Sequence, residues 1–304
     1  MCIRDSGAAH TVLDIGCNDG ALLDAFRPYT AHRYGVDPAA PSGTSHVLHA
    51  LPWSARAVEA LGRPLFTVIT ATNVWAHLDD LHDATALVKE SLAPGGLFVV
   101  HAPWVRDLLQ QGYYDTIYHE HRNYLGVGVM QRLAGAHDLV VTDTQYLPDV
   151  HGGTLRYYLQ HAPAPVSPNV ALAQALEAAA PSPAYFAATC DAHRAALRAL
   201  WPYSGHVPRL WAYGATAKGA ILNSFTGLGH NLTAVCDSTP AKQGQLYPGT
   251  TLRIQAEPEK GGPWPDAFLL TAWNHAGVVL DKLRTRGFRG QVIIPFPIPK
   301  VVRL

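Results

Sequence analysis

Short apolar segments alternate with stretches of helical periodicity along this chain. In its first part, four segments rich in aliphatic and β-branched residues run into polar or glycine-containing loops: TVLDIGCNDG (11–20), HRYGVD (32–37), LFTVITATN (65–73) and GGLFVVHAPW (95–104). Apolar residues at helical spacing separate them at 21–29, 54–61 and 81–93, and Pro94 with two glycines stops the last of these. Strands alternating with helices are typical of a parallel sheet covered by helices, so the pattern predicts an α/β domain.

A second series of the same kind follows an alanine-rich connector. Residues 171–201 favour helix and are interrupted by the sequence PSP at 181–183. Beyond them we expect strands at 209–219, 231–238, 266–274 and 290–299, with helices at 220–229 and 275–287. Because 304 residues are enough for two domains of ordinary size, we place one domain at 9–158 and the other at 159–304.

Composition narrows the classes of partner. Hydrophobic residues make up 48% of the chain and charged residues 15%, which favours a soluble globular protein over disorder. The 23 Lys and Arg balance the 23 Asp and Glu without a basic run, which argues against nucleic acid and anionic membranes and favours a small-molecule partner. No apolar run reaches the ~20 residues of a membrane span. The four cysteines, at positions 2, 17, 190 and 236, show no paired spacing, so we expect reduced thiols in a cytoplasmic protein.

The segment VLDIGCNDGALL has the pattern of a nucleoside site. Its strand opens onto a loop with Gly16 and Gly20 before a helix, which lets backbone N–H groups approach a ligand closely. About 20 residues later Asp37 ends the next strand, where a carboxylate can accept both ribose hydroxyls. Asn18 replaces the middle glycine of a dinucleotide loop, and Asp14 adds an acid that suits a cationic ligand such as S-adenosylmethionine. A glycine-rich turn without a ligand remains the alternative.

The order of motifs resembles one enzyme family. These motifs are VLDIGCNDGALL, ATNVWAHLDDL, DTIYHEHRNY, HGGTLRYY, YGATAKGAILN and DSTPAKQGQLYPGT, from about Val12 to the C-terminus. They resemble those of the sugar-nucleotide C-methyltransferases of deoxysugar biosynthesis. The resemblance implies a class I methyltransferase sheet that binds S-adenosylmethionine, followed by a second Rossmann-like α/β domain, with the active site in the cleft between them.

In this family the motif DTIYHEH lines the active site. The resemblance implies that His121 removes the acidified C3 hydrogen of a nucleoside-diphosphate 4-keto sugar, for which a side chain of pKa ~6.5 is well suited. It also implies that the Tyr118 hydroxyl stabilises the enolate and that Glu120 orients the sugar or the imidazole. A purely structural loop is the alternative. A zinc site is disfavoured, because His119 and His121 are two residues apart rather than the four of an HExxH helix, and we expect no metal.

Further contacts are predicted outside that motif. Asn73 follows a strand where class I methyltransferases contact the amino-acid part of the cofactor, whereas His77 is expected to be structural. The resemblance implies substrate contacts from His151 and Gly152. Lys218 lies in a second glycine loop, where it meets a pyrophosphate or, alternatively, belongs to a duplicated fold kept only as a wall of the cleft.

Two features depart from the family pattern, and the start of the chain is unusual in itself. Its members usually begin with a small cysteine-ligated zinc domain, and no such cysteines precede Val12. The opening MCIRDS fits no element that follows and resembles a translated adaptor scar, so we expect a missing N-terminal piece. His101 and Trp104 stand where the family tends to have glutamate and tyrosine, so substrate details are expected to differ.

Other functions remain open at this point. Methylation of oxygen or nitrogen on a related small molecule also needs a base but no enolate. Two Rossmann-like halves are compatible with a nicotinamide-dependent dehydrogenase, although Asp14 and the missing middle glycine argue against it. A non-catalytic nucleotide-binding module is the remaining alternative, against which the complete TIYHEH motif argues.

Overall fold

The computed structural model describes residues 10–41, 47–200 and 209–304, so the segment MCIRDS, Cys2 and residue 9 lie outside the described part. The chain divides into two compact units. The first unit comprises Met1–Arg106 and Glu120–Ala180, and the second comprises Asp107–His119 and Pro181–Leu304. The DTIYHEH motif therefore contributes residues to both units.

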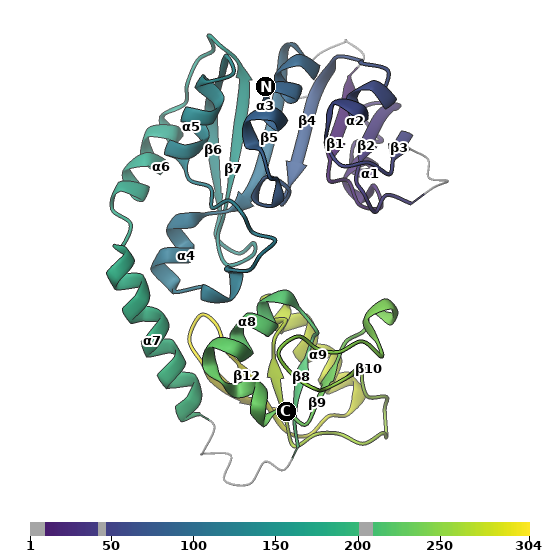
Figure 1. Ribbon diagram of the computed structural model, residues 1–304, viewed down its shortest axis with the longest axis vertical. Helices are drawn as coiled ribbons and strands as arrows, with labels where there is room; N and C mark the ends of the chain where they lie inside the picture. Colours follow the sequence, from purple (N-terminus) through teal and green to yellow (C-terminus); the bar gives the residue numbers. More distant parts are fainter. Residues whose placement is uncertain (1–9, 42–46, 201–208) are drawn as a thin grey trace. The chain divides into compact units, whose positions relative to one another are not determined.

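The first unit is built on a mixed sheet in which the described residues form seven strands in the order β3-β2-β1-β4-β5-β7-β6 (Figure 1). Strands β1 to β5 pair in parallel, and β7 runs antiparallel to both β5 and β6. The bounds are β1 Thr11–Ile15, β2 His32–Val36, β3 Val47–His49, β4 Phe66–Thr72, β5 Leu92–Pro103, β6 Leu139–Leu147 and β7 Thr154–His161. This arrangement brings the carboxyl ends of β1, β2 and β4 to one edge of the sheet, where open α/β sheets bind ligands.

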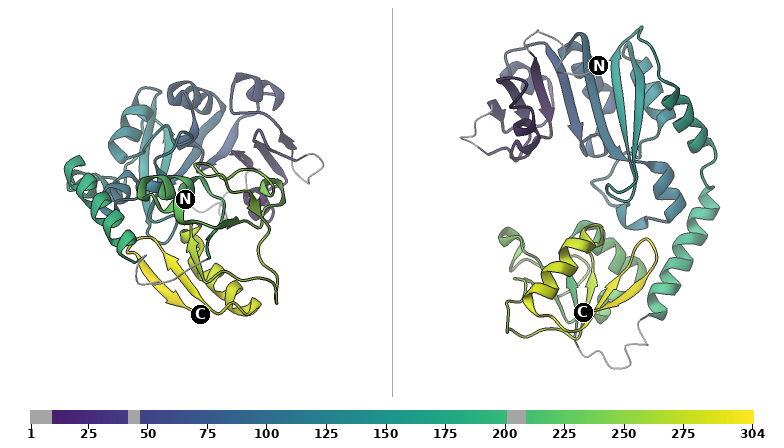
Figure 2. Two further views of the ribbon diagram at one scale, coloured as in Figure 1. Left: turned by 60° about the horizontal axis from the view of Figure 1, so that its bottom comes forward. Right: turned by 180° about the vertical axis from the view of Figure 1, so that it is seen from behind.

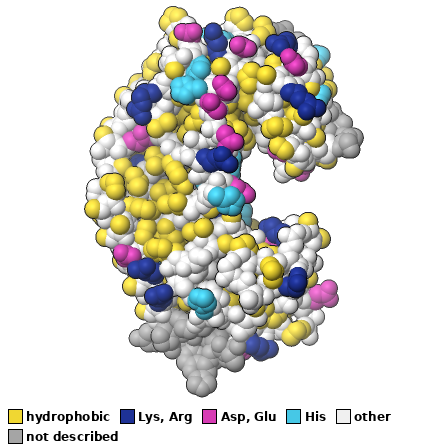
Figure 3. Space-filling model, in the orientation of Figure 1, with side chains coloured by type: hydrophobic (Ala, Val, Ile, Leu, Met, Phe, Trp, Pro, Cys, Tyr) yellow, Lys and Arg dark blue, Asp and Glu magenta, His cyan; other side chains and the backbone are white. Residues whose placement is uncertain are grey.

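Helices cover the sheet because its central strands are apolar on both faces. Leu13, Ile69 and Phe98 are fully buried on one face, and Val12 and Val68 are buried on the other, as expected for strands packed on two sides. The helices of this unit are α1 Ala21–Ala25, α2 Ala55–Ala60, α3 Leu81–Ser91, α5 Val127–Gly135 and α6 Pro168–Ala178, whereas most of α4 Val105–Gln111 belongs to the second unit. On the face seen in Figure 3, acidic and basic side chains are interspersed rather than gathered by sign.

The second unit contains another sheet, drawn in green to yellow in Figure 2. Its six described strands have the order β10-β9-β8-β11-β12-β13. All of them pair in parallel except β13, which is antiparallel to β12. The bounds are β8 Leu210–Tyr213, β9 Ala234–Cys236, β10 Ile254–Gln255, β11 Ala267–Leu270, β12 Gln291–Ile294 and β13 Lys300–Arg303, with helices α7 Pro183–Ala199, α8 Ala217–Thr226 and α9 Ala276–Arg286. The predicted fold class, an α/β protein with two Rossmann-like sheets, is confirmed.

Several boundaries differ from the sequence-based expectation. The connector breaks between α6 and α7 as predicted, but α8 begins at Ala217 rather than 220 because the Thr216 hydroxyl accepts the N–H of Gly219 and caps the helix. The strand expected from residue 95 begins at Leu92, directly after α3. Residue 158, where we expected the first domain to end, lies inside β7. Among the described residues, no helix combines the length and apolarity that crossing a membrane requires.

Candidate active site

The glycine loop after β1 is shaped by close backbone approach. Gly16 has a φ of +75°, and its N–H donates to the carbonyl of Val36 at 2.8 Å. A Cβ at this position would lie 2.1 Å from Cγ2 of Val74, so only glycine lets the loop pass the end of β4. Gly20 also has a positive φ, +86°, and begins α1.

Asp37 joins this loop to the end of β2. Its Oδ2 accepts the N–H of Asn18 at 3.1 Å, and its Oδ1 accepts the N–H of Ala39 at 2.7 Å. Each oxygen keeps acceptor capacity, and the side chain is half-buried rather than enclosed. The carboxylate is therefore oriented by the backbone while remaining able to accept hydrogen bonds from a ligand.

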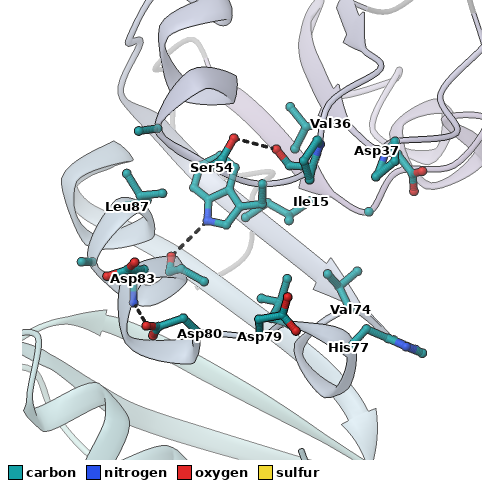
Figure 4. A pocket seen from close by; sticks show the side chains of 18 of the residues that line it. Ile15, Val36, Asp37, Ser54, Val74, His77, Asp79, Asp80, Asp83 and Leu87 are labelled. Carbon is teal, nitrogen blue, oxygen red and sulfur yellow. Dashed lines mark hydrogen bonds between the residues drawn. The ribbon is translucent and has the colours of Figure 1, made fainter. Parts of the chain in front are cut away.

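A cavity of about 820 Å³ opens beside these residues (Figure 4). Of the predicted cofactor residues, Gly16, Asp37 and Asn73 line it, and Asp14, Asn18 and Gly20 do not. The backbone N–H of Asn73 donates to the carbonyl of His101 at 2.8 Å. Its side-chain Oδ1 is buried without a hydrogen-bond partner among the described residues. An acceptor in that state fits the ammonium group of an amino-acid ligand.

Asp14 lies behind the cavity instead of in its wall. Its carboxyl is 3% exposed, and Oδ1 accepts the hydroxyl of Thr70 on β4 at 2.6 Å. Burial raises its pKa from 3.8 to about 6, and the negative charge of Asp37 acts in the same direction. The predicted acid is thus part of the support of the site.

Part of the cavity wall was missed by sequence reasoning. The loop between β3 and α2 contributes Trp53 and Ser54, and α3 contributes Asp80, Asp83 and Leu87 (Figure 4). The indole of Trp53 donates to the carbonyl of Ala84 at 3.0 Å, which fixes this loop against α3. The short strand β3 precedes the loop, and its three residues gave too weak a pattern to be predicted.

The second half of the YHEH motif lies against the wall of the cavity. The ring of His121 meets that of His77 edge-on, with centroids 4.8 Å apart, and His77 lines the cavity. The N–H groups of Arg122 and Asn123 both donate to the carbonyl of Ala76, at 2.8 and 3.1 Å. His121 is thereby fixed next to this cavity, and His77, which we expected to be structural, is its neighbour there.

The remaining predicted catalytic residues are divided between the units. Glu120 is an exposed residue of the first unit, whereas Tyr118 and His119 belong to the second unit, and their rings lie 6.5 Å apart. Within the described residues, no three His, Cys, Asp or Glu side chains converge as metal ligands would. The motif thus joins a segment beside the cavity to a segment of the second unit.

The HGG sequence forms the turn between β6 and β7. His151 and Gly152 have positive φ values of +52° and +85°. This turn brings Nε2 of His151 to 3.3 Å from Nδ2 of Asn73, at the carboxyl end of β4. His101 is buried nearby, and burial lowers its pKa to about 4. Two sequence motifs separated by 78 residues therefore meet at the edge of the cavity.

Lys218 lies in the first turn of α8 in the second unit. Its ammonium is 5.2 Å from the centroid of the Trp273 ring, and no described residue accepts a hydrogen bond from it. Burial lowers its pKa, while the nearby charge of Asp115 raises it. A half-buried cation without an acceptor suits an anionic ligand.

The sheet order, the glycine loop and the strand-end carboxylate beside a large cavity are typical of α/β proteins that bind nucleoside-containing ligands. Residues 4–144 match a family described as methyltransferase domain, and residues 149–297 match one described as C-methyltransferase C-terminal domain. The C-methyltransferase NovU of Streptomyces niveus is 33% identical over 99% of this chain and 76% of its own length. The chain therefore belongs to the C-methyltransferase family and is an S-adenosylmethionine-dependent methyltransferase, which removes the dehydrogenase and the non-catalytic module from the alternatives.

Other similarities are partial. A ubiquinone biosynthesis O-methyltransferase of Bradyrhizobium sp. (strain ORS 278) is 32% identical over 29% of this chain and 38% of its own length. Among solved structures, a 1,6-didemethyltoxoflavin-N1-methyltransferase of Burkholderia thailandensis is 18% identical, with a TM-score of 0.41 over 51% of this chain and 72% of that one. Likenesses of this extent assign neither a substrate nor a site.

Proposed function

We propose that the protein methylates a carbon atom of a nucleoside-diphosphate keto-deoxysugar after removing a proton from that carbon. The observation that carries this proposal is the position of His121, whose ring contacts His77 in the wall of the cofactor cavity. A base beside the methyl donor is what C-methylation of a carbon acid needs. The resemblance of the DTIYHEH motif supplies the keto sugar as the substrate class.

The residues of the cavity fit S-adenosylmethionine, which supplies an electrophilic methyl group when bound. Asp37 would accept the ribose hydroxyls, because its two oxygens are oriented by backbone N–H groups and retain lone pairs. Asn73 would accept the ammonium group through its buried, unpartnered Oδ1. Gly16 would allow close backbone approach to the ligand, with Asn18 and Gly20 shaping the loop from behind.

The chain's own groups would then carry the proton transfers. The neutral imidazole of His121 takes the C3 proton, and the electron pair of the broken C–H bond moves into an enolate. Tyr118 donates its hydroxyl to the enolate oxygen and lowers the cost of that charge. The enolate carbon would form a bond to the methyl group as the bond from that methyl to the sulfonium sulfur breaks, which leaves S-adenosylhomocysteine, and the imidazolium would return its proton to solvent. Glu120 orients the sugar or the imidazole.

Two further groups would hold the substrate. Lys218 would bind the diphosphate, because it is half-buried and its ammonium finds no acceptor among the described residues. His151 and Gly152 would contact the sugar from the turn that touches Asn73. Under this proposal the second glycine loop, which carries Lys218, binds the nucleotide part of the substrate and is not only a wall of the cleft.

The test is to incubate the protein in D₂O with S-adenosylmethionine and thymidine- or uridine-linked 4-keto sugars, following deuterium at C3 and the mass gain of one methyl group. His121→Ala should lose both exchange and transfer while still folding and binding cofactor. Tyr118→Phe should slow turnover by about 10² to 10³, the loss typical of one oxyanion donor. His119, an exposed residue of the same motif, provides the matched control, because His119→Ala should remain active.

Methyl transfer to oxygen without C3 exchange would replace this proposal by O-methylation. Exchange at the wild-type rate in His121→Ala, together with loss of exchange in Tyr118→Phe, would reverse the two roles. If neither substitution affects the reaction, the motif is a packed loop without a chemical role.

A further inference from the structure

The segment immediately before Tyr118 is embedded in the second unit. Tyr113, Tyr114, Asp115 and Thr116 are buried, and Asp115 is fully so. The last three form the 3₁₀ helix η3, Tyr114–Thr116, which packs against α8. Exposure begins again at Ile117, one residue before Tyr118. The buried segment thus ends where the proposed catalytic residues start.

Asp115 makes an uncommon contact for a buried carboxylate. Its Oδ2 accepts the indole N–H of Trp273 at 2.6 Å, whereas Oδ1 has no hydrogen-bond partner among the described residues. Burial raises its pKa to about 6, against the opposing effects of the Lys218 charge and the Trp273 bond. A carboxylate buried in this way is a poor source of stability, since desolvation opposes the gain from its hydrogen bonds. The contact of Asp115 with Trp273 instead fixes the position of the segment that carries Asp115.

The neighbouring side chains hold the same segment from other directions. Tyr113 stacks on Trp273, with centroids 5.3 Å apart and an interplanar angle of 26°. The hydroxyl of Tyr114 donates to Nδ1 of His193 at 3.0 Å, because Nε2 of His193 must carry the proton that it gives to the carbonyl of Pro295 at 2.7 Å. Three successive side chains are therefore fixed to elements of the second unit.

The geometry points to Asp115 as a positioning residue that holds Tyr118 through its hydrogen bond to Trp273. This inference rests on the proposed role of Tyr118 in stabilising the enolate. His121 is held separately, since Arg122 and Asn123 donate to the carbonyl of Ala76 in the first unit. We call the hydrogen bond between Asp115 and Trp273 the anchor. Loss of this anchor should displace Tyr118 and leave His121 in place.

A distinct kinetic signature follows. Misplacement of a catalytic group by about 1 Å costs on the order of 10² in rate, so Trp273→Phe should reduce kcat by about 10- to 100-fold. Cofactor affinity should not change, and the phenylalanine ring remains available beneath Lys218. In the Tyr118→Phe background, Trp273→Phe should cause no additional loss, because the hydroxyl that the anchor positions is already gone. A merely structural role would instead give losses that multiply.

The experiment measures kcat and C3 exchange at saturating S-adenosylmethionine for Tyr118→Phe, Trp273→Phe and the combined variant. Trp211→Phe, also in the second unit, is the matched control and should retain wild-type turnover. Asp115→Asn keeps an oxygen that can accept the indole N–H and should rescue most of the activity that Asp115→Ala loses. If Trp273→Phe fails to fold, Asp115→Ala takes its place in the cycle.

Wild-type turnover in Trp273→Phe, or losses that multiply in the combined variant, would overturn the anchor while Tyr118→Phe remains slow. The proposed function fails in a different way: wild-type protein then shows no C3 exchange, or Tyr118→Phe is fully active. The two failures are therefore distinguishable in one set of measurements.

Discussion

Asp14 and Asp37 are carboxylates of the same ligand-binding edge, and the fold gives them opposite environments. Asp37 accepts two backbone N–H groups and is half-buried at the cavity, whereas Asp14 is buried against the hydroxyl of Thr70. The sequence indicated that both acids are near the cofactor. It did not indicate which one faces the ligand, because that depends on the side-chain packing between β1 and β4.

Burial of Asp14 predicts a pH-dependent loss of stability. Its pKa is about 6 in the folded protein against 3.8 as the ordinary value, so folding favours the protonated form. The stabilisation is complete below about pH 4 and is lost as the pH rises through 6. Asp14→Asn still offers an oxygen to Thr70 and carries no charge. The difference in unfolding free energy between Asp14→Asn and the wild type should therefore grow by roughly 2 to 3 kcal/mol in favour of the variant from pH 4 to pH 7.

Urea unfolding at several pH values measures this difference. Asp138→Asn, an exposed carboxylate paired with Lys89 in the same unit, is the control and should follow the wild-type profile. A constant difference between Asp14→Asn and the wild type across this pH range would show that Asp14 does not titrate as its burial implies.

At the scale of elements, the helix α5 begins in an unusual way. Gly126 at its N-cap has no side chain to offer, and Glu177 of α6 instead accepts the N–H of Val127 at 2.6 Å. The same carboxylate accepts the indole N–H of Trp104. A Cβ on Gly126 would lie 2.8 Å from Oε1 of Glu177, so the glycine leaves room for this borrowed cap. Trp104, which departs from the family pattern, is thus held in place by Glu177.

Removing this cap should destabilise the first unit. Glu177→Ala leaves the helix N–H groups and the Trp104 indole without their acceptor, which should cost about 1 to 3 kcal/mol of unfolding free energy. Glu177→Gln keeps one acceptor oxygen and should lose less. Thermal or urea unfolding measures the effect, with the exposed Glu90→Ala expected within about 0.5 kcal/mol of the wild type. Equal stability of Glu177→Ala and Glu90→Ala would contradict the capping role.

The sequence predicted the strands that carry long apolar runs, and it missed those that do not. β1, β4 and β11 are buried on both faces and were expected. β6 and β7 alternate apolar and polar residues, a signal that was present but was interpreted only as the HGG motif. The short β3 and β10 give no usable period, because two or three residues cannot establish one.

At the scale of the whole molecule, the unit boundary could not be predicted from local patterns. Residues 107–119 follow β5 in the chain yet belong to the second unit. The hydrogen bond from Trp273 to Asp115, residues that are 158 apart in the chain, is one contact that ties this segment to the second unit. This contact depends on the packing of η3 against α8. Local periodicity carries no information on such a contact.

The two units also repeat one local design. Gly214 has a φ of +100° and donates to the carbonyl of Cys236 at 2.8 Å, as Gly16 does to Val36. Asp237 accepts the N–H of Ala215 at 2.8 Å, as Asp37 accepts that of Asn18. The difference is that Asp237 is buried and forms an ion pair with Lys242 at 3.3 Å. Burial opposes its ionisation, but backbone N–H groups and this lysine outweigh that effect and keep its pKa below the usual value.

This difference predicts a single S-adenosylmethionine site per chain. Asp37→Ala should weaken binding by roughly 1 to 3 kcal/mol, as loss of hydrogen bonds to a charged group typically does. In the second unit the equivalent position is filled, because the ammonium of Lys242 donates both to Asp237 and to the carbonyl of Ala215 at 3.0 Å. The wild type should therefore bind one equivalent of the cofactor per chain, and Lys242→Met, which leaves the Asp37 loop unchanged, should keep wild-type affinity at that loop, as measured by titration calorimetry. Two equivalents in the wild type, or unchanged affinity in Asp37→Ala, would contradict this prediction. Either result would mean that an accessible carboxylate does not decide which of the two glycine loops binds the cofactor.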